Sequence, residues 1–468
     1  METQLSLYNT ETRQKGVLHG KTLRMYTCGP TIYDFAHIGN FRTYVFEDLL
    51  RRSLKFFGFE VIQAMNLTDV DDKTIRGAIA KKISLKEFTE PFRIAFFEDL
   101  KTLSIEPVEH YPAATEYIGE MIHLIECLLQ KGYAYRSQNG SIYYKIRSFP
   151  SYGRLSHLHL DELKENASGD NEADEYDKEH IADFVLWKAY DPSRDGNIFW
   201  ESPFGKGRPG WHIECSAMSM KLLGETIDLH CGGVDNMFPH HENEIAQSEG
   251  CTGHPFVKHW IHVEHLLVDH KKMSKSLGNF YTLRDLLKRG YTGAEVRYLL
   301  LSNHYRMQLN FTFQGLDAAR NSLQRISDLI VRLRSIQEVG TSDVAKASLE
   351  RAYPRFISAL ADDLNISLAL AAIFDLVREL NLLCDAGKLK KGDVEQILKQ
   401  FAKWNEVLAV LPLQEEEEAP KDLLAMLKER EEARKKKDFK KSDALRDAIL
   451  QRGYFIEDTP TGARLKKK

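Results

Sequence analysis

A strand, a helix and a second strand follow one another near the start of the chain, and this succession constrains the fold more than any other feature. The apolar run LRMY leads into TCGPTIYDFAHIGN, after which Phe41, Val45 and Leu49 recur at helical spacing until Gly58. FEVIQAM then predicts the second strand. Strand, helix and strand within about 45 residues indicate a βαβ unit with parallel strands. We therefore expect an α/β fold whose ligands bind beyond the carboxyl ends of the strands, where Cys28 lies.

The chain is long enough for several domains, since 468 residues correspond to about three domains of ~150 residues. The acidic stretch ENASGDNEADEYDKEH interrupts the middle of the chain, and strand-like runs resume in GETIDLHCGGVD and KHWIHVEHLLVD. We expect an insertion between two halves of one sheet. Beyond Thr282 the pattern is helical, and LPLQEEEEAP is typical of a solvated linker. From Lys428 to Lys468, fourteen Lys/Arg against eight Asp/Glu form a basic tail.

Composition indicates a globular protein without a membrane anchor. The chain is 43% hydrophobic and 28% charged, and no window offers the ~18 apolar residues that a membrane span needs. The first residues lack the pattern of a secretory signal, so we expect a cytoplasmic protein. We accordingly expect its six cysteines to be reduced thiols, ligands or core residues rather than a disulfide framework.

Four residues in three separated motifs have the chemistry of metal ligands. They are Cys28, Cys215 in WHIECSAM, and His240 and Glu244 in FPHHENE. Two thiolates, an imidazole and a carboxylate suit tetrahedral zinc. Pro239 suits the first turn of a helix, which would place residues 240 and 244 on one face. The alternative is two buried core cysteines beside a polar helix start.

KKMSKSLGN, residues 271–279, combines lysines, serines and a glycine. Amide, hydroxyl and ammonium groups of such a loop can bind a triphosphate together. Taken alone, the loop could equally be a solvated surface segment. The HIG stretch upstream favours the first interpretation.

HIGN at 37–40 and KMSKS at 272–276 resemble the two signature motifs of class I aminoacyl-tRNA synthetases. The resemblance is closer to the cysteinyl-tRNA synthetase family and extends, in order, over nearly the whole chain. Its motifs are CGPTIYDFAHIGN, NLTDVDDK, GRPGWHIECSAMS, FPHHENEIAQSE, KMSKSLGNF, HYRMQLNFT and KDFKKSDALRDAI with GYFIEDTPTG. The resemblance implies a monomeric enzyme that activates L-cysteine with ATP and Mg²⁺ and transfers it to the terminal adenosine of tRNA(Cys).

The resemblance also implies roles for individual residues. Cys28, Cys215, His240 and Glu244 would bind one Zn²⁺, which selects the substrate thiolate and makes an editing domain unnecessary. The implied catalytic residues are His37, Lys272 and Lys275. The implied ATP-binding residues are Gly29, His37, Gly39, Asn40, Asp235 and Lys275, and the implied cysteine pocket is Thr68, Trp211 and His230.

The architecture expected from the resemblance is a Rossmann-like catalytic domain with an inserted connective subdomain, an all-α bundle and a small, helical anticodon-binding domain. The expected boundaries are 1–105 and 205–275 for the two catalytic halves, 106–204 for the insertion, 276–318 for the stem-contact region, 319–411 for the bundle, 412–420 for the linker and 421–468 for the anticodon-binding domain.

Three positions depart from the family pattern. Asn40 replaces the second signature histidine, Cys231 replaces a glycine after His230, and ARLKKK stands where the family often has a tryptophan. Two alternatives therefore remain: a relative that joins cysteine to an amino sugar, and a non-catalytic RNA-binding paralogue. The basic tail argues against the first, and the intact ligand set with Lys275 argues against the second.

Overall fold

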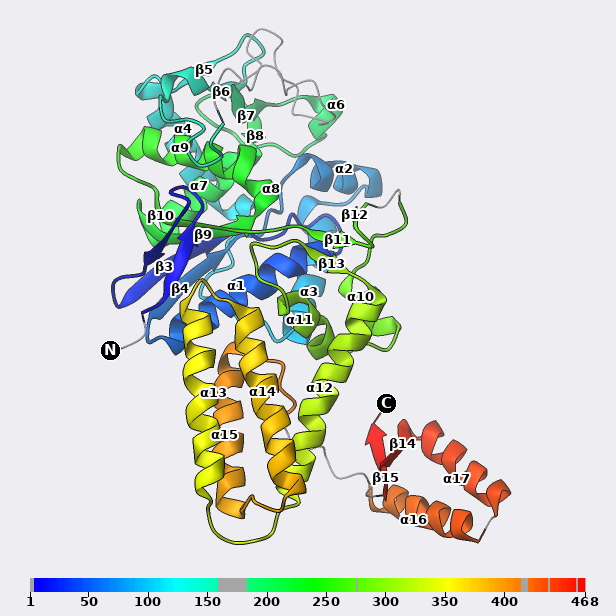
Figure 1. The fold of residues 1–468 in the computed structure, drawn as a ribbon. Helices are drawn as coiled ribbons and strands as arrows, with labels where there is room; N and C mark the ends of the chain where they lie inside the picture. Colours follow the sequence, from blue (N-terminus) through cyan, green and yellow to red (C-terminus); the bar gives the residue numbers. More distant parts are fainter. Residues whose placement is uncertain are drawn as a thin grey trace. The chain divides into compact units, whose positions relative to one another are not determined.

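The computed structural model describes residues 4–158, 183–274, 277–413, 420–436, 438–459 and 462–467 (Figure 1). The chain divides into two compact units, Met1–Leu411 and Pro412–Lys468. Within the described ranges, no helix combines the length and the apolar character that crossing a bilayer requires.

A four-stranded parallel sheet forms the centre of the larger unit. Its strands are β3 (Thr22–Thr27), β4 (Glu60–Met65), β9 (Ile227–Gly233) and β10 (Val257–Val263), in the order β10-β9-β3-β4. Helix α1 (Ile38–Phe56) connects β3 to β4, which confirms the predicted strand, helix and strand. Because β4 and β9 flank β3 on opposite sides, the carboxyl ends of β3 and β9 form a topological switch point, where sheets of this kind bind ligands.

Helix α1 forms because its sequence caps both ends and supplies an apolar face. His37 is the N-cap, and reciprocal hydrogen bonds with Asn40 form a capping box. Phe41 and Val45 are fully buried on its inner face. The helix ends at Phe56, and Gly58 follows with a φ of 91°, a conformation that glycine adopts without strain.

The segment inserted between β4 and β9 builds a second sheet. Strands β5 (Ala134–Arg136), β6 (Ile142–Tyr144), β7 (Phe184–Ala189) and β8 (Gly207–Pro209) pair antiparallel in that order. The helices of this part are α2 (Asp72–Lys81), α3 (Leu85–Thr102), η1 (Ala114–Tyr117), α4 (Ile118–Gln130), η2 (Ile146–Ser148) and α6 (Pro192–Asp195). The acidic stretch that predicted an insertion lies outside the described residues.

Two helices carry the motifs of the second catalytic half. They are α7 (Trp211–Leu223) and α9 (Glu242–Thr252), and α9 is preceded by α8 (Val234–Asn236) and the wide turn η3 (Met237–His241). Ile125 of α4, Ile213 of α7 and Ile245 of α9 are fully buried in one hydrophobic core. Phe238 is non-helical, with φ −135° and ψ 131°, and helical geometry runs from Pro239 into α9, which confirms the placement of Pro239 in the first turn of a helix.

A three-stranded sheet and a helical bundle complete the larger unit (Figure 1). The sheet has the order β12-β11-β13. Its strands are β11 (Leu266–Val268), β12 (Lys271–Lys272) and β13 (Leu309–Phe311), and the nearby helices are α10 (Leu283–Lys288) and α11 (Gly293–Leu301). The bundle consists of α12 (Phe313–Arg334), α13 (Asp343–Ala361), α14 (Ile366–Asp385) and α15 (Lys391–Leu408), which confirms the predicted helical region.

The N-terminal hairpin is attached to the bundle through Asp363. The hairpin consists of β1 (Ser6–Asn9) and β2 (Gln14–Val17). Asp363 is fully buried, accepts a hydrogen bond from the Tyr8 N–H at 2.9 Å, and accepts others from Tyr305 Oη at 2.6 Å and Arg306 Nε at 2.8 Å. One carboxylate therefore joins the first strand, the HYRMQLNFT motif and the loop before α14.

The smaller unit combines two helices with a two-stranded sheet. It contains α16 (Lys421–Lys435), α17 (Phe439–Gln451), β14 (Tyr454–Thr459) and β15 (Gly462–Lys467), and the strands pair antiparallel. Leu423, Leu427, Ile449 and Leu465 form its core. The expected small helical domain thus also contains two strands of six residues each, of which β14 packs on α17 and β15 packs on α16.

Two cysteines differ from the sequence-based expectation. Cys127 of α4 and Cys251 of α9 form a disulfide with a Cα–Cα distance of 5.7 Å, so the expectation of reduced thiols, ligands or core residues is wrong for this pair. The sequence does not indicate this disulfide, because the two cysteines are 124 positions apart and come together only when α4 packs on α9. Cys28, Cys215, Cys231 and Cys384 are free thiols.

Candidate active site

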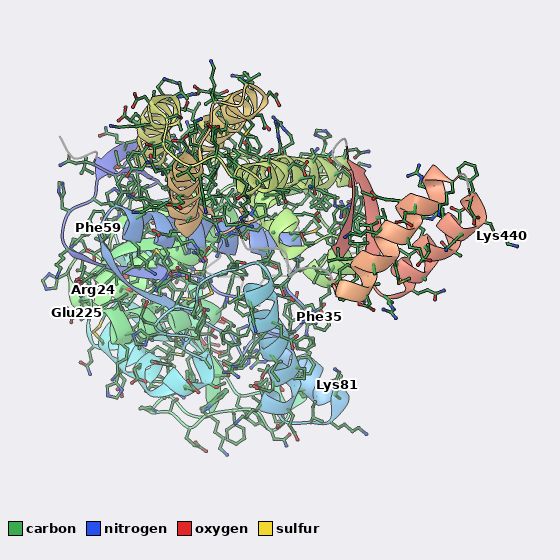
Figure 2. All side chains as sticks on the ribbon, turned by 90° about the horizontal axis from the view of Figure 1, so that it is seen from below. Arg24, Phe35, Phe59, Lys81, Glu225 and Lys440 are labelled. Atoms are coloured by element: carbon green, nitrogen blue, oxygen red, sulfur yellow. A yellow bond between two sulfur atoms is a disulfide. The ribbon has the colours of Figure 1, made fainter. Side chains whose placement is uncertain are left out.

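A cavity of about 530 Å³ opens at the carboxyl ends of the central strands. Its walls combine the loops that follow β3 and β4 with the starts of α1, α7 and α8, and with the segment around β11. Side chains at the surface rim include Phe35, which is 41% exposed (Figure 2). The predicted site residues on its wall are Cys28, Gly29, His37, Gly39, Asn40, Thr68, Trp211, Cys215, Asp235, His240 and Lys272.

The loops after β3 and β4 fix one wall of the cavity. The Gly29 N–H donates to Asn66 Oδ1 at 2.9 Å, and Asn66 Nδ2 donates to Thr68 Oγ1 at 3.1 Å. The Thr68 N–H donates in turn to the Pro30 carbonyl oxygen at 3.0 Å. Thr68 is thus held in place on the cavity wall by both loops.

The start of α1 presents His37 on the opposite part of the wall. Its ring lies edge-on to Phe280, with the ring centroids 5.2 Å apart. The Ile38 N–H donates to the Tyr281 carbonyl oxygen at 3.0 Å, which ties the helix start to the segment after the KMSKS stretch. The two signature motifs therefore meet in space although more than 230 residues separate them.

The four predicted metal ligands lie together and are buried, and three of them, Cys28, Cys215 and His240, line the cavity. One ligand atom from each of Cys28, Cys215, His240 and Glu244 lies within 4.8 Å of the others. Cys28 follows β3, Cys215 lies on α7, and His240 and Glu244 come from η3 and α9. The topology thus brings three distant motifs to one point, as the sequence pattern predicted.

The donor set fits a zinc ion. Glu244 Oε1 is buried without a hydrogen-bond partner and lies 3.2 Å from His240 Nε2. Tetrahedral zinc holds ligand atoms at about 2.0–2.3 Å, which places them about 3.3–3.8 Å apart. The Cys28–Cys215 hydrogen bond raises the pKa of Cys28 and lowers that of Cys215, to about 7, and burial raises the pKa of Glu244. A thiol with a lowered pKa, such as Cys215, is suited to releasing its proton when a cation binds.

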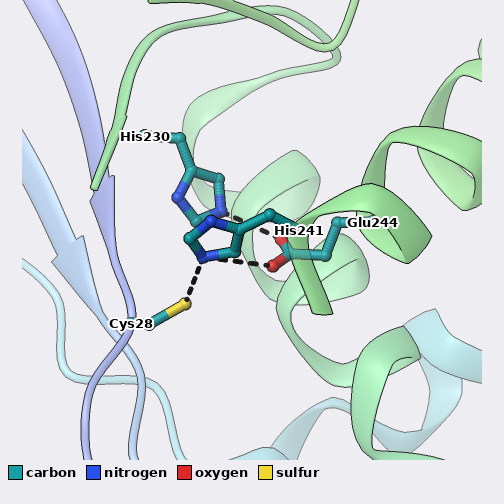
Figure 3. Close-up of side chains that lie close together, drawn as sticks. All are labelled: Cys28, His230, His241 and Glu244. Carbon is teal, nitrogen blue, oxygen red and sulfur yellow. Dashed lines mark hydrogen bonds and ion pairs between the residues drawn. The ribbon is translucent and has the colours of Figure 1, made fainter. Parts of the chain in front are cut away.

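A second group overlaps the first and was not predicted as a ligand set. Cys28, His230, His241 and Glu244 also have ligand atoms within 4.8 Å of one another (Figure 3). His241 Nε2 lies 3.2 Å from Cys28 Sγ, and His230 Nε2 lies 3.0 Å from Glu244 Oε2. The doubled histidine of FPHHENE could have indicated His241 as a further ligand. The prediction took only His240, because His240 and Glu244 are four residues apart and share one helix face. His230 does not line the cavity and lies behind Glu244.

Further imidazoles support these histidines from behind. His212 Nδ1 lies 2.9 Å from His240 Nδ1, and His262 Nε2 lies 2.8 Å from His241 Nδ1. Burial lowers the pKa of His212 and of His262 to about 3, so both rings are neutral. Sequence reasoning missed both residues because they contact the ligand histidines only through tertiary packing. Neutral imidazoles in this position fix the orientation of the rings in front of them.

Trp211 and Asp235 lie on the cavity wall near the ligand group. Trp211, the first residue of α7, is 40% exposed, and its ring lies 4.4 Å from that of His240. Asp235 belongs to α8, directly after β9. Both therefore face the space above the ligands, where a substrate would lie.

The Lys-rich loop begins at the end of the β11–β12 hairpin. Lys272 lines the cavity, whereas Lys275 lies outside the described residues. Asn279 spans the loop: its Oδ1 accepts from the Ser274 N–H at 2.9 Å and its Nδ2 donates to the Lys272 carbonyl oxygen at 3.2 Å. Its side chain thereby holds the two ends of the loop together.

Cys231 points away from the ligand group. Side chains alternate along a strand, so His230 and Cys231 occupy opposite faces of β9. Cys231 is fully buried, and burial together with Glu47 of α1 raises the pKa of its thiol. Its φ is not positive, so the backbone tolerates a side chain at this position. At Gly232, by contrast, a Cβ would lie 2.8 Å from the His241 ring.

Comparisons with known proteins identify the family. Residues 14–321 match the tRNA synthetases class I (C) catalytic domain, residues 355–412 the DALR domain, and residues 416–464 the cysteinyl-tRNA ligase anticodon binding domain. A cysteine–tRNA ligase of Protochlamydia amoebophila is 61% identical, with 99% of this chain and 98% of that protein covered. The chain belongs to the cysteine–tRNA ligase family.

Other members and a solved structure agree with this assignment. A cysteine–tRNA ligase of Chlamydia muridarum is 54% identical over 99% of both chains. The fold resembles that of Mycobacterium tuberculosis methionyl-tRNA synthetase, with a TM-score of 0.59, 13% identity and coverage of 84% of this chain and 89% of that one. The family expected from the motifs and the class I synthetase fold are thus both confirmed.

Proposed function

We propose that this protein is a cysteine–tRNA ligase. It activates L-cysteine with ATP, which forms cysteinyl-adenylate and releases pyrophosphate, and it transfers the cysteinyl group to the 3′-terminal adenosine of tRNA(Cys). One observation carries the proposal: a single cavity is lined by the thiols Cys28 and Cys215 and by His37 at the start of α1. Groups that suit a thiolate-selecting metal and groups that suit a nucleotide phosphate therefore face the same space.

Amino-acid selection would depend on the group at the base of the cavity. Cys28, Cys215, His240 and Glu244 would hold a zinc ion, which when bound would ligate the substrate thiolate and discriminate against the hydroxyl of serine. The chain keeps these side chains buried and oriented, with His212 behind His240 and the Trp211 ring beside it. Thr68 and Trp211 would bound the cysteine pocket, with His230 acting through Glu244.

Nucleotide activation would depend on the start of α1 and on the Lys-rich loop. Attack of the cysteine carboxylate on the α-phosphate develops negative charge, which the helix N-terminus and the His37 ring can stabilise by hydrogen bonding. Lys272 would attract the phosphates from the cavity wall, and Lys275 would do so by family resemblance, together with Mg²⁺ bound to ATP. Gly29, Gly39, Asn40 and Asp235 would complete the ATP site.

The remaining parts of the proposal concern tRNA and the state of the protein. The basic unit after residue 412 would bind the anticodon stem, where lysines and arginines contact phosphates. We propose a cytoplasmic monomer with the catalytic boundaries given above. An amino-sugar ligase is disfavoured, because the match to the anticodon-binding domain covers residues 416–464.

Cysteine-dependent exchange of labelled pyrophosphate into ATP tests the activation step, and charging of total tRNA tests the transfer step. We expect exchange with cysteine, little with serine or alanine, and cysteine attached to tRNA. Exchange without tRNA charging would favour the amino-sugar ligase. If cysteine does not stimulate pyrophosphate exchange, both enzyme hypotheses, the cysteine–tRNA ligase and the amino-sugar ligase, are refuted. That result would favour the RNA-binding paralogue.

A further inference from the structure

Asn40, which replaces the second histidine of the signature motif, forms two hydrogen bonds with the first, His37. The Asn40 N–H donates to His37 Nδ1, and the His37 N–H donates to Asn40 Oδ1, both at 3.1 Å. The atom facing the His37 N–H must be the amide oxygen, because a backbone N–H can only donate. The two residues thus form a closed pair of hydrogen bonds over the first turn of α1.

This pairing determines which ring nitrogen of His37 carries the proton. A ring nitrogen that accepts a hydrogen bond holds a lone pair, so Nδ1 is unprotonated and the proton of the neutral ring is on Nε2. The Asn40 side chain stands three residues after the cap residue, His37, and is short enough for its amide oxygen to reach the His37 backbone N–H. The backbone N–H of residue 40 then points at the His37 ring. The backbone N–H of residue 40 therefore binds the imidazole directly, whereas the Asn40 side chain binds the His37 backbone N–H and acts on the ring by fixing the first turn of α1.

The surroundings keep the ring in this orientation. A Cβ on Gly39 would lie 2.9 Å from His37 Nδ1, so the ring packs against the bare backbone of residue 39. Phe280 meets the ring edge-on on another side. His37 and Asn40 both line the cavity.

We propose that Asn40 is a positioning residue for His37, which it holds as the Nε2–H tautomer so that the ring donates a hydrogen bond to the phosphates of ATP. The inference rests on the proposed role of His37 in ATP activation. It gives Asn40 a function different from that of a second phosphate-binding histidine. Losing the amide oxygen should then slow activation without weakening cysteine binding.

Two variants separate positioning from direct phosphate contact. Asn40→Leu keeps the approximate size and removes the acceptor, whereas Asn40→Gln keeps a carboxamide at the position where a capping box commonly has one. We expect Asn40→Leu to reduce kcat of cysteine-dependent pyrophosphate exchange about tenfold with unchanged KM for cysteine, because a 1 Å misplacement costs about 10²-fold and a loosened turn should shift the ring by about half as much. We expect Asn40→Gln to restore most of the rate. If Asn40→Leu does not fold, Asn40→Ala provides the same comparison.

The tautomer itself is measured by NMR on full-length protein with ¹⁵N-labelled histidine, and His37→Gln assigns the signal. We expect the Nε2–H form in the wild type and in Asn40→Gln. In Asn40→Leu the His37 N–H loses its acceptor, the first turn loosens and the residue-40 N–H no longer stays aimed at Nδ1, so we expect a mixture of tautomers. A wild-type ring protonated on Nδ1, or an unchanged tautomer in a slowed Asn40→Leu, would overturn the inference while leaving the enzyme assignment intact. Wild-type protein without any cysteine-dependent exchange would instead overturn the proposed function, whichever tautomer is found.

Discussion

Gly39→Ala is the most informative single substitution at the start of α1. The added Cβ would lie 2.9 Å from His37 Nδ1, 3.0 Å from its Cε1 and 3.2 Å from Met273 Cε. These are side-chain atoms, so they can move without disturbing the backbone. The substitution therefore displaces the His37 ring and leaves the fold in place.

The magnitude follows from the distances. Ordinary contact begins near 3.4 Å, so the His37 ring has to move by about 0.5 Å. A displacement of 1 Å in an active site costs about 10²-fold in rate, and an off-rotamer side chain costs about 0.5–1.5 kcal/mol. The displacement predicts about a tenfold loss of exchange activity, and the rotamer cost corresponds to a loss of about two- to twelvefold. Replacing a helical glycine by alanine contributes up to about 1 kcal/mol of stability in the opposite direction.

Gly119→Ala is the matched control, because Gly119 is also the second residue of its helix and a Cβ there meets nothing within 4 Å. We expect both variants to unfold in urea at denaturant concentrations equal to or above that of the wild type. Only Gly39→Ala should lose pyrophosphate exchange. An active Gly39→Ala protein would refute the argument that the position must be glycine to accommodate the ring.

Replacing Cys215 by serine should lower the zinc content and the cysteine affinity; metal analysis and the KM for cysteine measure these, and unchanged values would contradict the ligand assignment. Truncation after Leu411 should preserve pyrophosphate exchange and abolish tRNA charging, since the catalytic cavity lies entirely in the larger unit. Asp363→Ala should lower the urea unfolding free energy by about 3 kcal/mol, because it leaves the Tyr305 hydroxyl and the Arg306 guanidinium without their buried partner. Burial lowers the pKa of His262 to about 3; between pH 6.5 and 3 only the unfolded chain takes up this proton, so this histidine alone should lower stability by about 1.4 kcal/mol per pH unit below 6.5. The dependence of the urea unfolding free energy on pH should therefore be shallower for His262→Gln than for the wild type.

Local sequence patterns predicted the features that depend on neighbouring residues. The periodicity around Phe41 and Val45 gave the βαβ unit, and the chemistry of Cys28, Cys215, His240 and Glu244 indicated a common ligand group. Their proximity follows from the sheet, because strands β3 and β9 end side by side.

Contacts between distant segments could not be predicted in this way. Thr10 Oγ1 lies 2.9 Å from His262 Nδ1. The two residues are 252 positions apart, and no sequence motif suggests that they are in contact. The Cys127–Cys251 disulfide and the sheet of the smaller unit likewise depend on which helices pack together. Cys231 required knowledge of the strand faces, since only the register shows that its side chain avoids the ligands.

The attachment of the N-terminal hairpin to Asp363 has a consequence for synthesis of the chain on the ribosome. The Tyr8 N–H and its acceptor are 355 positions apart. At about 5–20 residues per second, the hairpin leaves the ribosome roughly 20–70 s before this partner exists. During that interval its edge is unprotected, and the short four-residue strands with the exposed Lys15 limit pairing with other nascent chains. The first strand to be made is thus among the last to be locked in place.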